Sequence, residues 1–331
     1  TGRNWALEVC NPHPDVGDAM PSSRGYTGGF IFGFILCITI LVSCSKSENT
    51  TADSQKLKIT TTTTMLKDLI QTIGGDKVEV INLMGEGVDP HLYNASAGDV
   101  EKLANADVII YGGLHLEGKM SDVFGKLENS GKDVLDVGNT LDKSLLIFQE
   151  ENIPDPHVWF DTNLWILEAE AVAAKLSDID PENKDYYMSN LESYKKELSD
   201  LTEYVIRRIN EIPESQRILV TAHDAFGYFA KQFRLEVRSI QGISTDSEAG
   251  TKDISELADF IAEKKIKAVF IESSVPRKTI ESLQEAVKAR GWDVKIGGEL
   301  YSDSLGDKEH NTDTYIKTVQ KNVDVIVEAL K

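Results

Sequence analysis

The sequence predicts an α/β protein with two lobes, each built on parallel strands, and one long helix that joins them. Two observations lead to this prediction. Short β-branched runs alternate with amphipathic helical segments in two separate series, and the longest helical pattern of the chain lies between the series. Such alternation is typical of parallel strands connected by helical crossovers. We therefore expect Rossmann-like lobes over residues 56–179 and 213–331, with a linking helix over residues 180–212.

Each series supplies four short strands. The first is expected to have helices over 65–75 and 97–106, a further helix after residue 113, and strands at 56–62 (KLKITTT), 77–84 (KVEVINLM), 107–113 (DVIIYGG) and 132–137 (KDVLDV). The second is expected to have a helix between its first two strands, helices over 253–265 and 277–290, a final helix to Lys331, and strands at 217–222 (RILVTA), 235–241 (LEVRSIQ), 267–273 (KAVFIES) and 292–298 (WDVKIGG).

The linking segment begins and ends with clear signals. Asp180 and Pro181 supply an N-cap and a proline at the first helical position. Large apolar residues follow at steps of three and four: Tyr187, Leu191, Tyr194, Leu198, Leu201, Val205 and Ile209. A helix that stops before Pro213 has about 32 residues and a length of about 48 Å. One helix of this length can brace both lobes and limit how far they hinge.

The N-terminal residues are expected to form a leader rather than part of the fold. Residues 30–42 are an almost unbroken apolar run after Arg24. A membrane-spanning helix needs about 20 residues, so this shorter run fits the central region of a secretory signal. The ending Leu41-Val42-Ser43-Cys44 resembles the lipobox of bacterial lipoproteins. This resemblance implies that residues 1–43 are removed, and that Cys44 carries a lipid that anchors an exported protein to a membrane, facing the periplasm or the cell exterior.

The remaining N-terminal features concern the true start, the tether and the cysteines. Residues 1–19 show neither targeting nor folding character, and we expect them to lie upstream of a start at Met20. Residues 44–55 are polar after the cysteine and read as a flexible tether. Cys10 and Cys37 fall in the leader, so no disulfide framework or thiolate metal site is expected in the folded body.

The chain is strongly acidic, with a formal net charge of −19. An acidic body repels nucleic acid and anionic lipid surfaces, so no nucleic-acid partner is expected. Cations are the natural small partners of such a surface, although the charge can also serve solubility alone.

Three histidines and one acid stand where strands pass into loops or helices. His91 and His157 each follow Asp-Pro, while His223 closes the strand at 217–222 and Asp303 follows the last strand. Ligands of open α/β sheets bind outside the carboxyl ends of the strands. We expect the four side chains to converge in the cleft between the lobes, although a lone histidine at a strand end is more often a hydrogen-bonded loop residue.

This set of side chains suits a divalent first-row transition metal, because imidazole is a borderline ligand and carboxylate a hard one. Magnesium and calcium prefer sites made of oxygen alone. A catalytic zinc usually has three protein ligands and an open position for water, so four protein ligands favour carriage over catalysis. We expect a binding protein and no enzyme. A metal-dependent hydrolase and a surface adhesin are the alternatives.

Four stretches resemble the metal-binding solute-binding lipoproteins of manganese, zinc and iron ABC transporters, some of which have been described as adhesins. They are GEGVDPHLYNASAGDVEKLANADVIIYGGLHLEGKM, PDPHVWFD, VTAHDAFGYFAKQF and LYSDSLG. The resemblance covers residues 56–331. It implies two lobes joined by a rigid helix, one buried metal ion, and a monomer that delivers the ion to a membrane permease. By motif, it assigns the metal ligands to His91, His157, His223 and Asp303.

The sequence pattern is compatible with more than one metal ion. Many manganese-type members have a glutamate at the position of His223, whereas zinc-type members often carry a histidine-rich loop between the first two ligands. Residues 116–156 contain no histidine. We therefore expect manganese or zinc, with iron(II) less favoured, and zinc should bind in vitro at least as tightly as manganese.

Four further residues are candidates for roles around the site. His115 resembles a family position that is near the metal but is not a ligand, and it fits either a hydrogen-bonding or a packing role. Glu117 is expected to assist it. Glu272 ends a strand and could orient a ligand, although a salt bridge or a helix cap is the more common role. His310 lies in a polar loop and is expected to be solvated.

Overall fold

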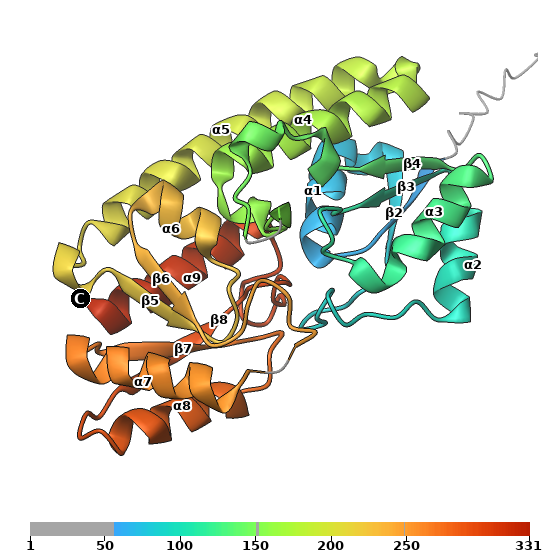
Figure 1. Ribbon diagram of the computed structural model, residues 1–331. Helices are drawn as coiled ribbons and strands as arrows, with labels where there is room; N and C mark the ends of the chain where they lie inside the picture. The colour runs from blue at the N-terminus through green and yellow to red at the C-terminus, as the bar shows by residue number, and fades with distance from the viewer. Residues whose placement is uncertain (1–55, 150–151, 248) are drawn as a thin grey trace, which may run out of the picture. The chain divides into compact units, whose positions relative to one another are not determined.

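The computed structural model describes residues 56–149, 152–247 and 249–331, shown in colour in Figure 1. The predicted leader, Cys44 and the tether lie outside these residues. The described residues all belong to one compact unit, Ala52–Lys331. Among them, no helix combines the length and the apolar character needed to cross a membrane.

The N-terminal lobe is built on a parallel sheet of four strands in the order β2-β1-β3-β4. The strands are β1 (Leu57–Thr61), β2 (Val78–Asn82), β3 (Val108–Tyr111) and β4 (Asp133–Asp136). The crossover helices are α1 (Thr64–Gly74), α2 (Ala97–Asn105) and α3 (Ser121–Asn129). Ser96 and Asp99 form a reciprocal capping box at the start of α2, which satisfies two backbone N–H groups of its first turn.

The C-terminal lobe repeats the strand–helix alternation. Its strands pair in parallel as β5 with β6 and β7 with β8, and β5 also contacts β7. The strands are β5 (Ile218–Thr221), β6 (Glu236–Ser239), β7 (Ala268–Glu272) and β8 (Lys295–Leu300). The helices are α6 (Gly227–Phe233), α7 (Thr251–Lys264), α8 (Lys278–Lys288) and α9 (Tyr315–Leu330). The predicted α/β class with parallel strands is confirmed.

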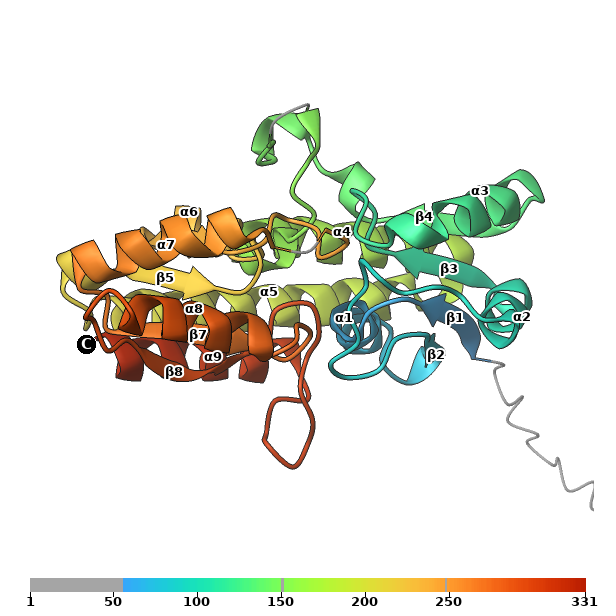
Figure 2. The same ribbon diagram turned by 60° about the horizontal axis from the view of Figure 1, so that its bottom comes forward.

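Two long helices, and not one, lie between the two series. Helix α5 (Lys184–Ile209) has 26 residues, about 39 Å. It is shorter than expected at both ends, because Pro181–Asn183 form a separate 3₁₀ turn before it and the helix already ends at Ile209. Helix α4 (Thr162–Ile179) precedes it and packs along it. The apolar stripe of α5 is buried as predicted, and α5 contacts both α1 and α9, one helix from each lobe (Figures 1 and 2).

The main hydrophobic core is shared by the two lobes and the helical pair. One cluster of buried side chains includes Ile59 from β1, Leu176 from α4, Leu198 from α5 and Val327 from α9. Two smaller clusters each belong to a single lobe. Because burial of apolar surface is the main stabilising term in folding, a core that continues through both lobes resists their separation. We therefore expect small tilting and loop movement rather than wide opening.

Candidate metal centre

The first Asp-Pro-His turn lies in the loop after β2. The carboxylate oxygen Oδ1 of Asp89 accepts a hydrogen bond from the backbone N–H of His91 at 2.9 Å. This link from an aspartate to the residue two positions on is the Asx turn, which fixes the backbone locally. The other oxygen, Oδ2, accepts from the hydroxyl of Thr245 at 2.5 Å. Thr245 belongs to the segment between β6 and α7, so the first turn is tied to the C-terminal lobe.

The second Asp-Pro-His turn lies just before α4 and is more deeply buried. Oδ1 of Asp155 accepts from the backbone N–H of His157 at 3.0 Å and also lies 2.7 Å from the ring Nδ1 of His157. Val158–Phe160 follow as a buried 3₁₀ turn. The indole N–H of Trp159 donates to the carbonyl of Ser302 at 3.1 Å. The turn therefore orients its own histidine and also holds the backbone next to Asp303.

His223 follows β5 and is held by Glu272 at the end of the neighbouring β7. Oε1 of Glu272 accepts from the backbone N–H groups of Ala222 and His223, both at 2.8 Å. Its Oε2 lies 2.5 Å from Nδ1 of His223. Glu272 therefore holds both the backbone and the ring of His223.

Asp303 completes a cluster in which four ligand atoms lie within 4.8 Å of one another. Its carboxylate lies 3.3 Å from Nε2 of His223, 3.5 Å from Nε2 of His157 and 3.9 Å from Nε2 of His91. Nε2 of His157 lies 3.4 Å from that of His91 and 3.3 Å from that of His223. Neither carboxylate oxygen of Asp303 accepts a hydrogen bond from the described residues. A buried carboxylate without such partners needs a cation to compensate it.

Burial and the neighbouring charges act in opposite directions on the pKa values of the cluster residues. Burial lowers the pKa of His91 to about 3, so this imidazole is neutral and able to bind a metal. Burial alone raises the pKa of Asp303, but the charge of the neighbouring His223 outweighs this effect and holds the pKa below its usual value. Burial alone lowers the pKa of His223, yet the charges of Glu272 and Asp303 raise it well above the usual range.

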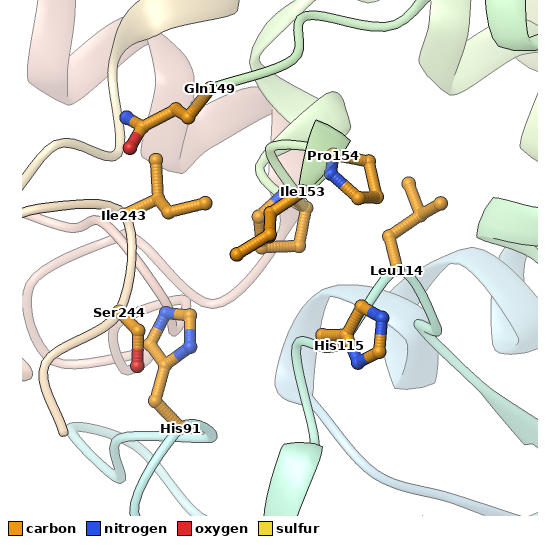
Figure 3. A pocket seen from close by; sticks show the side chains of 9 residues that line it. His91, Leu114, His115, Gln149, Ile153, Pro154, Ile243 and Ser244 are labelled. Atoms are coloured by element: carbon orange, nitrogen blue, oxygen red, sulfur yellow. The ribbon is translucent and has the colours of Figure 1, made fainter. Parts of the chain in front are cut away.

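The other candidates from the sequence take different places. Glu117 is buried and accepts hydrogen bonds from Thr62 and from the N–H groups of Gly112 and Gly113, so it shapes the turn after β3. His115 is exposed and lines a cavity together with His91 (Figure 3). His310 is exposed, as expected, and its ring lies 2.8 Å from Asp307.

Three important partners were not identified from the sequence. Asp89 and Asp155 stand two residues before their histidines, and this spacing is itself the signal for an Asx turn. Thr245 is nearly buried and reaches Asp89 from the other lobe. No local pattern predicts that contact, because 156 positions of sequence separate the two residues.

Comparison with known proteins identifies the class. The model of the family described as ZnuA, zinc-uptake complex component A periplasmic, matches residues 59–329. The zinc-binding protein TroA of Treponema pallidum is 47% identical over 284 residues, which cover 86% of this chain and 92% of TroA. The manganese-binding lipoprotein MntA of Bacillus subtilis is 42% identical over 304 residues, which cover 92% of this chain and 99% of MntA.

The fold comparison agrees. The structure of periplasmic TroA from Treponema pallidum matches with a TM-score of 0.81 at 47% identity and covers 83% of this chain and 99% of that one. These relatives are metal-binding proteins and not enzymes, so the prediction of a binding protein is confirmed, and neither the hydrolase nor the adhesin alternative gains support. The chain belongs to the ZnuA family of metal-binding, substrate-binding components of ABC transporters.

Proposed function

We propose that this protein captures one manganese or zinc ion outside the cytoplasm and delivers it to the permease of an ABC transporter. The observation that carries the proposal is the buried cluster of three imidazoles and one carboxylate, in which the carboxylate oxygens lack hydrogen-bond partners among the described residues. Membership of a family of metal transport proteins supports the same function.

In this proposal the ligands are Nε2 of His91, His157 and His223 and the carboxylate of Asp303. The distances support the assignment. In a tetrahedral site with zinc–nitrogen bonds of about 2.0–2.1 Å, neighbouring ligand atoms lie about 3.3–3.4 Å apart. The two Nε2 separations of 3.4 and 3.3 Å match that edge. The nitrogen of His157 therefore already lies at the right distance from its two imidazole neighbours, whereas His91 and Asp303, 3.9 Å apart, must approach each other to close around an ion.

The neighbouring carboxylates prepare two of the imidazoles. Asp155 and Glu272 face Nδ1 of His157 and His223, respectively. A metal-binding histidine usually donates its other N–H to such a partner, which leaves the Nε2 lone pair directed at the metal. Because metal ligands must be deprotonated, binding displaces the proton of His223. Affinity should fall as the pH decreases.

Two further parts of the proposal concern the anchor and the metal. Relatives named as lipoproteins support a lipid on Cys44, which would tether the protein, in this proposal a monomer, to a membrane through residues 44–55. If Cys44 is the anchor, Cys44→Ser moves the protein from the membrane fraction to the aqueous fraction, and continued membrane attachment contradicts the anchor. Relatives named for zinc and for manganese leave both ions open, and zinc should bind at least as tightly as manganese.

The proposal is tested with the mature protein purified without added metal. Elemental analysis should find one manganese or zinc ion per chain. After the ion is removed, adding zinc at about 1,000 times Kd should stabilise the protein by about 4 kcal/mol. The double variant His91→Ala/Asp303→Ala should lose both effects, while His310→Ala, at an exposed histidine, should keep them. A double variant that still binds one ion with the full thermal shift shows that the site assignment is wrong.

A further inference from the structure

One cavity reaches the cluster from outside. It has a volume of about 260 Å³ and is lined by residues that include His91, His115, Leu114, Ile153 and Ile243 (Figure 3). Of the four cluster residues, His91 alone lines this cavity. His157 and His223 are fully buried, and Asp303 is 1% exposed. An ion that arrives through this cavity therefore meets His91 first among the four.

The described residues that line the cavity offer few groups that can replace the water shell of an ion. Leu114, Ile153, Pro154, Pro156 and Ile243 are apolar, and the polar lining residues besides His91 are His115, Gln149 and Ser244. Loss of hydration without compensating ligands is costly for any ion. Imidazole is a good ligand for zinc, whereas neutral amide and hydroxyl oxygens suit harder ions. Among the described residues that line the cavity, His115 is therefore the side chain best able to hold the ion on its way in.

The backbone holds His115 in an uncommon conformation. Gly113, Leu114 and His115 have φ angles of 74°, 52° and 68°, all in the left-handed region. This conformation is infrequent for residues other than glycine, and strained stretches of this kind gather at functional sites. The carboxylate of Glu117 holds the turn by accepting from the N–H of Gly112 at 2.8 Å and of Gly113 at 3.1 Å. The buried acid thus stabilises the turn that presents His115 to the cavity.

The His115 ring is available for such a role. It is exposed, and no residue within 56–149, 152–247 or 249–331 forms a hydrogen bond with it. Figure 3 shows the rings of His91 and His115 on two sides of the same pocket. An ion bound to His115 can therefore pass to His91 within one cavity.

We propose that His115 is a transit ligand, which binds the incoming metal ion at the cavity mouth and passes it to His91. This inference rests on the proposed function and adds a route to it. A ligand on the route lowers the barrier equally for capture and release, because both directions cross the same barrier. It does not belong to the final coordination shell, so it leaves the equilibrium affinity unchanged.

A pair of isosteric variants tests the proposal. Asn and Asp both tolerate the left-handed conformation, but only Asp supplies a strong metal ligand. Stopped-flow mixing of the metal-free protein with Zn²⁺ gives the association rate, and excess chelator gives the dissociation rate. Trp159 can report both, since its ring lies 5.2 Å from that of His157. His310→Asn is the matched control at an exposed histidine outside the cavity.

The expected result is that His115→Asn slows association and dissociation by about the same factor, about tenfold, which corresponds to about 1.4 kcal/mol of barrier. Its Kd should match that of the wild type. His115→Asp and His310→Asn should keep near wild-type rates. Unchanged rates in His115→Asn overturn the proposal, and so does a weaker Kd caused by faster dissociation, which would make His115 a ligand of the final site. Equal slowing in His115→Asp indicates a steric effect and also overturns it. Failure of the wild type to bind Zn²⁺ would instead refute the proposed function.

Discussion

The two Asp-Pro-His turns share a sequence and a backbone hydrogen bond, yet their surroundings differ. In each, the aspartate accepts from the N–H of the histidine two positions later, at 2.9 Å in the first turn and 3.0 Å in the second. Asp155 also contacts the ring of His157, within the same turn. The second carboxylate oxygen of Asp89 instead accepts a hydrogen bond from Thr245, in the other lobe.

This difference teaches that one tripeptide can place two proposed metal ligands in different surroundings. His157 is fully buried and its ring is oriented by its own turn. His91 lines the cavity, and its turn depends on a contact between the lobes. We infer that the second turn mainly sets the equilibrium affinity, whereas the first turn mainly sets how fast the ion enters and leaves.

The largest expected difference between the turns appears when each histidine is removed. His157→Ala removes the ring partner of the buried Asp155 carboxylate and leaves it the backbone N–H of residue 157, and a hydrogen bond to a charged group contributes about 1.5–3 kcal/mol. His91→Ala removes no such bond, because His91 donates to Asp89 through its backbone N–H, which alanine keeps. Both variants should lose tight metal binding, but urea unfolding of the metal-free proteins should show a larger loss of stability for His157→Ala. Equal losses would contradict the comparison.

Substituting the aspartates should separate affinity from structure. Asp155→Asn weakens the partner that orients His157, and changes of this kind typically reduce metal affinity about 10–100-fold. Asp89→Asn keeps a carbonyl oxygen that can accept from the His91 backbone and removes no contact to the ring, so we expect a loss below about tenfold. Competition titration with a chromophoric zinc chelator measures both values. If Asp89→Asn loses as much affinity as Asp155→Asn, the two turns do not differ in the way proposed.

Much of this molecule could be predicted from its sequence, because strand–helix alternation and strand-end positions are local signals. The two parallel-stranded lobes and the meeting of His91, His157, His223 and Asp303 follow from such signals. The sequence did not distinguish helix α4 as a separate element. Apolar residues lie around much of this helix, so its amphipathic periodicity is weak. The contact of Thr245 with Asp89 depends on tertiary packing between distant segments, so no local pattern contains it.

The smallest expected effect comes from the contact between the lobes. Thr245→Val keeps the shape of the side chain but removes its hydrogen bond to Asp89. A hydrogen bond to a charged group contributes about 1.5 kcal/mol at the low end of its range, so zinc release should accelerate by up to about tenfold. Stopped-flow chelation measures this rate. If Thr245→Val binds zinc more slowly than the wild type but releases it at the wild-type rate, the first turn does not retain the ion.

The central claim is that one ion is held by three imidazole nitrogens and one carboxylate. X-ray absorption spectroscopy of the zinc-loaded protein tests this claim most directly. The account predicts one zinc per chain with about three nitrogen ligands at about 2.0–2.1 Å and one carboxylate oxygen at about 2.0–2.2 Å. The outer-shell scattering of imidazole should be lost in part in His157→Ala. A first shell made of oxygen alone, or a spectrum that does not change in His157→Ala, would contradict it.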